Sequence, residues 1–255
     1  MDQDTLRFQA WQLDALGAHP AGTDLLAIGP FRAVVSTAPG SGGWVTIVGG
    51  TTSRPEITHA VSRLRSMFEQ RQTQLEIEYN ERLFPEVGRW LEAAGLRLAE
   101  RNPLMACRPA GLKPFAATGV GLHRLAATSS AGDLQAFQTI RWTNGGDNEE
   151  RPPPVEQLRK DLAAARSVYM LALLDGEAAG TGVSHALHGA VEIVGVVTRA
   201  SMRRRGVAAT VTSDLVGMHF DSGGDFAFLD AANEEAASVY QRLGFTRFGA
   251  NLVYR

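Results

Sequence analysis

One order of secondary-structure elements occurs twice in this chain of 255 residues, and this repetition limits the folds it can adopt. In the first half, an apolar strand and a helical pattern are followed by a strand at 75–80 and a helix that ends at Gly95. In the second half, the same order leads to a strand at 226–231 and a helix that ends at Gly244. A glycine directly after a helix is a common C-terminal cap. The pattern indicates a weak internal duplication and therefore two α/β units.

The boundary between the halves is predicted near the middle of the chain. The stretch 108–121 is rich in proline and glycine, which is typical of a linker. We therefore expect a first domain at 1–110, a linker at 111–120 and a second domain at 121–255. The second domain has the predicted order β-α-α-β-β-β-α-β-α-β-β and ends in a hairpin at 245–255, which makes it a mixed α/β fold.

Composition excludes several classes of function. Hydrophobic residues make up 44% of the chain, enough for a sizeable core, and the net charge of −2 gives no general attraction to nucleic acid or to a membrane surface. The single cysteine, Cys107, excludes an intramolecular disulfide and lies in an apolar run, where a buried thiol is expected. With no signal segment, no membrane span and no cluster of metal ligands, we predict a soluble, cytoplasmic protein without a metal site.

A local basic feature stands out in the second half. The stretch 201–211, SMRRRGVAATV, places three arginines before a glycine and small residues at the start of a predicted helix. A helix N-terminus carries partial positive charge and unpaired N–H groups, and small residues let a ligand approach them. Taken alone, the stretch fits either a solvated basic turn or a cradle for a pyrophosphate. A GxGxxG or GxxxxGK[ST] motif is not present.

The neighbourhood of this stretch favours the cradle. An apolar strand, VEIVGVV, precedes Arg203, Arg204, Arg205 and Gly206, and Asn233 is followed by a helix ending in AASVYQRLGF. These two motifs resemble those of the GNAT (general N-acetyltransferase) superfamily, [QR]-x-x-G-x-[GA] and Y-x-x-x-G-F, over about 120–255. The resemblance implies a mixed, mostly antiparallel sheet and, with the duplication, two tandem GNAT-like domains. Ala208 stands where many members have glycine, an accepted variant.

The resemblance also implies acetyl-CoA as the co-substrate. In the family, the end of the strand pairs with the pantetheine arm and the following amides hold the pyrophosphate. On this chain the implied cofactor-binding residues are Val196, Val197, Thr198, Arg203, Arg204, Arg205, Gly206, Val207, Ala208, Ala209 and Asn233.

Two residues are candidates for the catalysis of amide formation, which needs a neutral amine and benefits from a base. Glu192 is the only charge in its apolar strand and matches a catalytic glutamate of some members; the alternative is that it simply faces solvent. Tyr240 matches the family tyrosine that protonates the leaving thiolate. Asp230, His185 and His188 are secondary candidates for the base.

The acceptor is less well specified. The loop that lines the acceptor pocket in this family contains Asp147, Glu149 and Glu150, which suit a cationic amine but also fit an acidic surface loop. We expect direct transfer in a ternary complex to a primary amine of a small molecule, and a homodimer is possible. The alternatives are acetylation of a protein N-terminus or lysine, and a non-catalytic acyl-CoA-binding regulator.

The first half lacks the cofactor features. Its strand is followed by TTSRPEITHAV, which has no [QR]-x-x-G-x-[GA] motif. It also carries Pro55 at the start of the helix, where backbone amides should point at a phosphate. Leu91 stands four residues before Gly95, where Tyr240 stands before Gly244. We therefore expect a degenerate GNAT-like domain or an unrelated accessory α/β domain.

Overall fold

The computed structural model divides the chain into two compact units, and each is described by itself. The first contains Met1–Leu104, Ala231–Asn233 and Arg247–Arg255, and the second contains Met105–Asp230 and Glu234–Thr246. The structure describes residues 2–17, 22–37, 43–49, 53–145, 152, 154–164 and 167–255.

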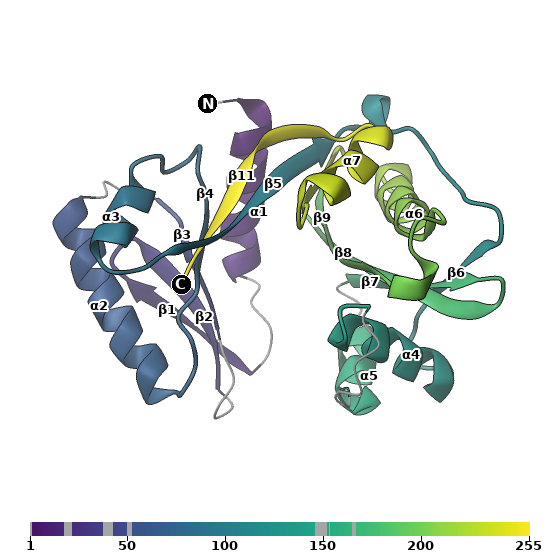
Figure 1. Cartoon of the computed structure of the whole chain (residues 1–255), viewed down its shortest axis with the longest axis horizontal. Coiled ribbons are helices and arrows are strands. Elements are labelled where there is room, and N and C mark those ends of the chain that lie inside the picture. Colours follow the sequence, from purple (N-terminus) through teal and green to yellow (C-terminus); the bar gives the residue numbers. More distant parts are fainter. Residues whose placement is uncertain are drawn as a thin grey trace. The chain divides into compact units, whose positions relative to one another are not determined.

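The first unit is a mixed sheet with helices on both faces (Figure 1). Its strands follow the order β1-β2-β3-β4-β11-β5, in which β3 and β4 are parallel. Its elements are α1 (Gln3–Gly17), β1 (Thr23–Ile28), β2 (Phe31–Ser36), β3 (Gly43–Ile47), α2 (Arg54–Gln70), β4 (Ile77–Asn80), α3 (Val87–Ala93), most of β5 (Leu98–Cys107) and nearly all of β11 (Thr246–Tyr254).

The core of the first unit lies between the sheet and α2 and α3. Ile57, Leu64 and Phe68 of α2 and Leu91 of α3 pack there against buried residues of the strands. The other face is covered by α1, whose Gln12 donates from Nε2 to Thr46 Oγ1 at 3.0 Å.

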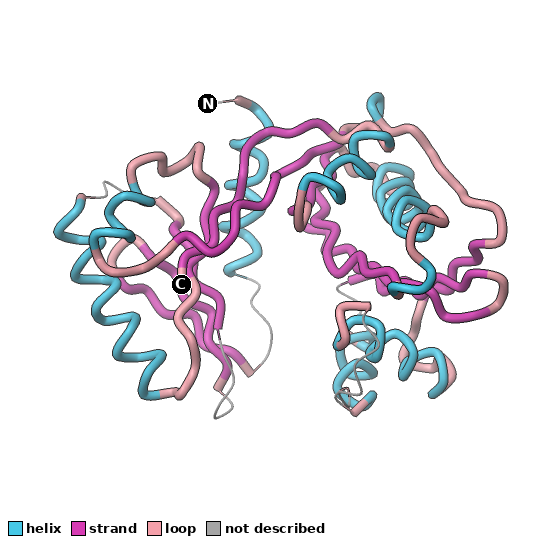
Figure 2. Tube along the Cα trace, viewed as in Figure 1, coloured by secondary structure: helices cyan, strands magenta, loops and turns pink. Residues whose placement is uncertain are grey.

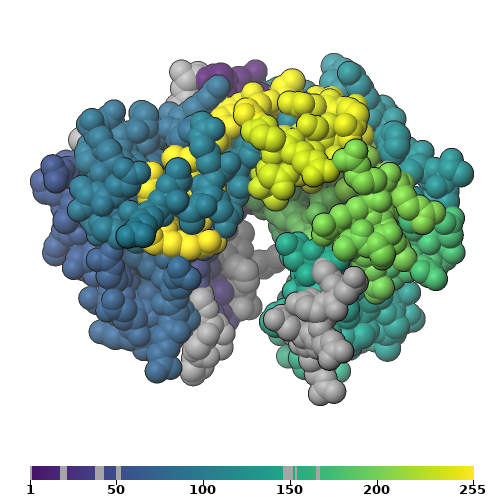
Figure 3. Space-filling model, viewed as in Figure 1, coloured from purple at the N-terminus to yellow at the C-terminus, as the bar shows by residue number. Residues whose placement is uncertain are grey.

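The C-terminal strand β11 belongs to the first unit. It pairs antiparallel with β4, from Asn251 opposite Asn80 to Tyr254 opposite Ile77. The predicted hairpin at 245–255 is wrong, because the segment forms one continuous strand over Thr246–Tyr254 and Gly249 lies inside it. Figure 3 shows the yellow residues of β11 among the blue and teal residues of the first unit.

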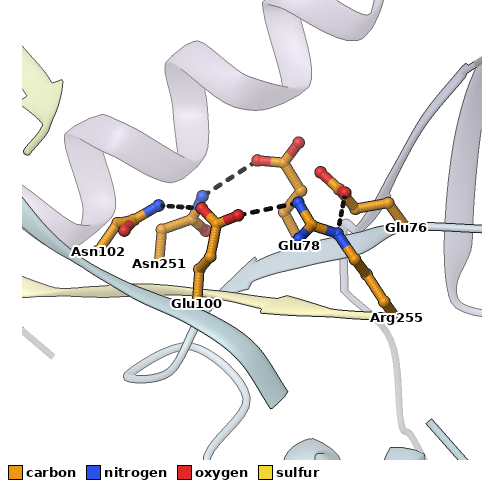
Figure 4. A network of polar contacts seen from close by, with 6 residues as sticks. All are labelled: Glu76, Glu78, Glu100, Asn102, Asn251 and Arg255. Atoms are coloured by element: carbon orange, nitrogen blue, oxygen red, sulfur yellow. Dashed lines mark hydrogen bonds and ion pairs between the residues drawn. The ribbon is translucent and has the colours of Figure 1, made fainter. Parts of the chain in front are cut away.

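Polar side chains reinforce this attachment (Figure 4). Arg255 donates from Nε to Glu76 at 2.6 Å and from Nη2 to Glu100 at 2.8 Å, while Asn251 donates from Nδ2 to Glu78 at 3.1 Å. The compact units thus divide the chain differently from the predicted ranges of 1–110, 111–120 and 121–255, because strand pairing carries the last residues into the first unit.

The second unit is also a mixed, mostly antiparallel sheet with helices on both faces. Its strands follow the order β10-β9-β8-β7-β6, and among them only the pair β10 and β9 is parallel within the described residues. Its elements are η1 (Pro109–Gly111), β6 (Val120–Arg124), α4 (Ala131–Trp142), α5 (Val155–Ala163), β7 (Ser167–Leu174), β8 (Glu177–Leu187), β9 (Ala190–Thr198), η2 (Ala200–Met202), α6 (Val207–Asp221), β10 (Phe226–Asp230) and α7 (Glu234–Arg242).

The two faces of this sheet differ in what covers them (Figure 1). On one face α6 packs so closely that a Cβ on Gly182 would meet Val211 Cγ1 and Leu215 Cδ1. The opposite face carries α4 and α5, whose Phe137 and Leu158 form a core with strand residues. The predicted β7–β8 hairpin is confirmed: Asp175 and Gly176 form its turn, both with positive φ.

The predicted linker is hydrogen-bonded to α6, although most of its residues are exposed. After η1 the chain runs without regular structure to β6 (Figure 2). Phe115 donates its backbone N–H to Ser213 Oγ at 2.8 Å, and Ala117 donates to Thr210 Oγ1 at 2.9 Å. The segment is therefore fixed along α6, inside the second unit.

Candidate active site

The parallel strands β9 and β10 pair over only part of their length. Their register runs from Ala190 opposite Phe226 to Glu192 opposite Phe228. Strand β9 then continues to Thr198, beyond its described pairing with β10. Backbone groups of a strand need hydrogen-bond partners. The stretch from Ile193 to Thr198 therefore offers an edge to which an extended ligand can add like a further strand.

A bulge bends β9 within this free stretch. The register with β8 shifts between Thr181 and Val183, which stand opposite Val197 and Val194. Gly195 lies in the bulge with φ of 57°, a conformation that favours glycine. The bulge changes the direction of the end of β9, so this end does not continue the regular pairing with β10.

Glu192, the predicted base, stands on the α4 face of the sheet and is half-buried. Val194, two residues on, packs in the core beneath α4, and side chains two apart in a strand share a face. The side chain of Glu192 therefore lies beside the last pairing of β9 and β10, and not on the α6 face.

His185 stands directly opposite Glu192 on β8, and Ser167 stands opposite His185 on β7. Ser167 Oγ and His185 Nδ1 are 2.6 Å apart, which fixes the orientation of the imidazole. Burial, and then the nearby charge of Arg141, lower the pKa of His185, so the ring is neutral at neutral pH. A row of polar side chains thus crosses three strands on this face.

The predicted phosphate cradle forms the start of α6. Gly206 precedes the helix with φ of 80° and has no side chain that could cap it. The first hydrogen bond of the helix is from Thr210 N to Gly206 O, so the amides of Val207, Ala208 and Ala209 have no partner within the helix. A Cβ on Gly206 would lie 2.6 Å from Ala117 Cβ, which gives glycine a second reason to be here.

The arginines of the cradle have surface partners. Arg204 pairs with Glu235 and Arg205 with Asp175, each at 2.7 Å and exposed, while Arg203 Nε donates to Thr198 O at 3.2 Å. Exposed pairs of this kind stabilise little, about 0–1 kcal/mol, so a phosphate can replace the carboxylates at small cost.

Tyr240, the predicted proton donor, lies on α7 and is 7% exposed. Its ring contacts Phe245, with centroids 6.0 Å apart. Burial raises the pKa of Tyr240 to about 12, so the phenol stays protonated at neutral pH.

The remaining candidates lie in several places. Asp230 ends β10 with an exposed side chain, and His188 is exposed in the turn between β8 and β9. Asn233 directly precedes α7 but groups with the first unit. The acidic loop residues Asp147, Glu149 and Glu150 lie outside the described residues.

Cys107 is buried, as predicted, at 2% exposure. It belongs to the second unit, although the sequence boundary placed it in the first. Burial raises the pKa of its thiol to about 11, so it remains protonated and is a poor nucleophile at neutral pH.

The equivalent helix of the first unit is closed to an anion. Its N-terminus is preceded by Ser53, whose backbone N–H and hydroxyl both donate to the Glu56 carboxylate, at 3.0 and 2.9 Å. That carboxylate already occupies the position an anion would take, and Pro55 supplies no amide there. Leu91, at the place of Tyr240, is fully buried.

Two other classes of site find no support in the described residues. These residues contain no group of three or more His, Cys, Asp or Glu side chains placed to hold a metal ion. Among them there is also no helix with the length and hydropathy that crossing a membrane requires.

Two side chains of this region were missed in the sequence. Arg141 ends α4 and reaches the bulge of β9, and Ser167 begins β7 and holds His185. Neither lies in a motif, and only the pairing of distant segments brings them to Glu192.

Comparison with known structures shows which fold the chain has. A GCN5-related N-acetyltransferase from Kribbella flavida is 24% identical with a TM-score of 0.75, covering 97% of this chain and 93% of that one. A GCN5-related N-acetyltransferase from Sphaerobacter thermophilus is 17% identical with a TM-score of 0.66, covering 88% and 76%. A tandem GNAT protein from the clavulanic acid biosynthesis pathway is 13% identical with a TM-score of 0.60, covering 99% and 95%. At these identities the likeness shows the fold, which is that of two GNAT-like domains.

The family follows from the sequence of the second unit. Residues 134–245 match the model of the acetyltransferase (GNAT) family. This part of the chain is a GNAT domain, and GNAT enzymes are acyltransferases that use acetyl-CoA. No curated protein sequence matches the chain.

Proposed function

We propose that the second unit moves the acetyl group of acetyl-CoA to a primary amine of a small molecule, by direct attack in a ternary complex. The observation that carries this proposal is that β9 and β10 pair over only part of their length. Glu192 lies at its last pair, and the uncapped start of α6 follows the free end of β9.

The free edge of β9 and the start of α6 suit the two parts of the co-substrate. The backbone of Val196, Val197 and Thr198 can pair with the amide groups of the pantetheine arm. The amides of the first turn of α6 and the side chains of Arg203, Arg204 and Arg205 can hold the pyrophosphate. Asn233 remains a predicted further contact.

The reaction needs one proton removed and one supplied. The neutral amine attacks the thioester carbonyl carbon, the C–N bond forms and the C–S bond breaks. An amine with a pKa near 10 is mostly protonated at pH 7, and freeing it costs about 4 kcal/mol. Glu192 accepts the proton of the amine, and Tyr240, protonated because it is buried, donates to the departing sulfur.

Direct transfer is supported by the state of the only cysteine. An acyl-cysteine intermediate would need an accessible thiolate, and Cys107 is a buried thiol with a raised pKa. A small-molecule acceptor is supported by the tandem GNAT protein of similar fold, which comes from the clavulanic acid biosynthesis pathway.

The test is release of free thiol from acetyl-CoA in the presence of a panel of small amines and, separately, of a peptide array. We expect release with small amines and not with peptides. Acetylation of peptides alone would identify a protein acetyltransferase. Tight binding of acetyl-CoA without release with any amine or peptide would identify a regulator and contradict the proposal.

A further inference from the structure

We propose that Arg141 binds a carboxylate of the acceptor, so that the substrate is an amine that also carries a carboxylate, as an amino acid does. The inference rests on the proposed function and adds the substrate class.

The two faces of the sheet differ as approaches to the end of the β9–β10 pairing. The α6 face is filled by apolar side chains, such as Val211 and Leu215 over Gly182. The α4 face carries the half-buried polar groups Glu192 and His185 instead. An amine that meets Glu192 therefore approaches along the α4 face.

Arg141 lies on this route. A Cβ built on Gly195 would be 2.9 Å from Arg141 Cζ, 3.1 Å from Nε and 3.2 Å from Nη2. The guanidinium thus packs directly against the backbone of the bulge in β9, three residues beyond Glu192. The residue is exposed overall, although partial burial of the guanidinium lowers the pKa of Arg141 from its usual value.

Two contacts fix the arginine in this position. Its Cζ lies 5.8 Å from the centre of the Phe137 ring, which restrains the guanidinium. The turn after α4 is joined to the end of β9, because Ala200 N donates to Gly145 O at 2.8 Å. Gly145 has φ of 73° and approaches the Thr198 carbonyl so closely that a Cβ there would overlap it. The charge is therefore presented in place before any ligand arrives.

Arg141 also differs from two arginines of the cradle, Arg204 and Arg205. Arg204 and Arg205 each pair with a carboxylate. Within the described part of the chain, Arg141 has no carboxylate within ion-pair distance, and its charge acts instead on His185. Among the residues that the structure describes, it is a cation without a carboxylate counter-ion at the edge of the proposed site.

This charge selects among amines. A cation beside the acceptor site disfavours acceptors that are only cationic, because like charges repel. A carboxylate removes the repulsion and matches the planar guanidinium through two parallel hydrogen bonds. The same contact would orient the amine end of the acceptor toward Glu192.

The test compares matched acceptors that differ only in the carboxylate. Thiol release is measured with the common amino acids, β-alanine and 4-aminobutyrate, and with the carboxamide of each. We expect at least tenfold higher kcat/KM for the best carboxylate-bearing amine than for its carboxamide. Arg141→Gln should lower that kcat/KM at least tenfold through KM, and it should not lower the kcat/KM of the carboxamide, because the repulsion of the cationic amine is relieved. Arg141→Lys should restore part of the loss.

The control is Arg124→Gln, which removes an exposed arginine of β6. It should leave kcat/KM unchanged for both the carboxylate-bearing amine and its carboxamide. The inference would be overturned by equal kcat/KM for the carboxylate-bearing amine and its carboxamide in every pair. It would also be overturned if Arg141→Gln left the ratio of these two kcat/KM values unchanged.

A binding measurement separates this inference from the proposed function. The same pairs are titrated calorimetrically into the protein saturated with coenzyme A. Binding of a carboxylate-bearing amine that is weakened tenfold in Arg141→Gln supports the inference even if no acetyl group is transferred. If no carboxylate-bearing member binds better than its carboxamide, the inference fails whether or not transfer occurs.

Discussion

Glu192 of β9 and Phe228 of β10 form the last register pair of the two parallel strands. Beyond this pair β9 continues to Thr198, still paired with β8 but past its described pairing with β10, and a bulge lies at Gly195. The one acidic side chain of the strand therefore lies where a backbone edge becomes available to a ligand. This coincidence of a base and an open edge makes the second unit suited to acyl transfer.

Replacing the proposed base should reduce turnover without affecting the co-substrate. We expect Glu192→Gln to lower kcat about 10²–10⁴-fold, the usual contribution of a general base, and to leave acetyl-CoA affinity within twofold. Steady-state kinetics and calorimetry measure the two effects. Glu177→Gln, an exposed change at the start of β8, is the control. Full activity of Glu192→Gln would eliminate Glu192 as the base.

Replacing the proposed acid should affect the same step. Tyr240→Phe keeps the buried ring and its contact with Phe245 but removes the hydroxyl. We expect kcat to fall about 10–100-fold while KM for acetyl-CoA and the melting temperature stay nearly constant. An unchanged kcat would show that the sulfur leaves without a proton from this residue.

A side chain at Gly206 should remove co-substrate binding. Its φ of 80° costs other residues about 1–2 kcal/mol, and a Cβ would crowd Ala117. We expect Gly206→Val to abolish acetyl-CoA binding in calorimetry while the circular dichroism spectrum is retained. Gly217→Ala, where a Cβ meets nothing within 4 Å, is the control and should stabilise α6 slightly. Wild-type affinity in Gly206→Val would place the pyrophosphate elsewhere.

The first unit should become more stable when one of its carboxylates is neutralised. Burial raises the pKa of Glu78 from 4.5 to about 6. Below pH 4.5 the carboxyl is protonated in both the folded and the unfolded state, so it does not change the free energy of unfolding. As the pH rises through 6, the folded state must hold a disfavoured negative charge, which lowers the free energy of unfolding by up to about 2 kcal/mol. We expect Glu78→Gln to raise the free energy of unfolding by about 1 kcal/mol at pH 7 and to have little effect at pH 4. Denaturant unfolding at both pH values measures this, and equal effects would contradict it.

Removing the last strand should damage the first unit rather than the second. Deletion of 247–255 takes away the partner of β4 and the contacts of Asn251 and Arg255. We expect amides of β4 to lose protection from hydrogen exchange, whereas those of β8 and α6 keep theirs. Loss of protection confined to the second unit would contradict the assignment of β11.

Much of the fold followed from local patterns. Apolar runs, glycine-ended helices and the Asp175-Gly176 turn predicted the order from β3 to α3 in the first half and from β6 to α7 in the second, because these signals lie within a few residues of each other. No prediction was made for α1, β1 and β2. The C-terminal hairpin was predicted wrongly, since Gly249 alone cannot show that Asn251 and Tyr254 pair with a strand some 170 residues earlier. Strand pairing over that distance leaves no local signal.

For the candidate site, the sequence by itself determined the small-residue start of α6, the lone charge of β9 and the tyrosine of α7, because each belongs to a contiguous motif. Only the tertiary structure decided where the β9–β10 pairing ends, that His185 and Ser167 stand beside Glu192, and that Arg141 rests on Gly195. The physical reason is that register, bulge and helix packing are set by contacts between segments distant in the chain, and these contacts decide which side chains share a face.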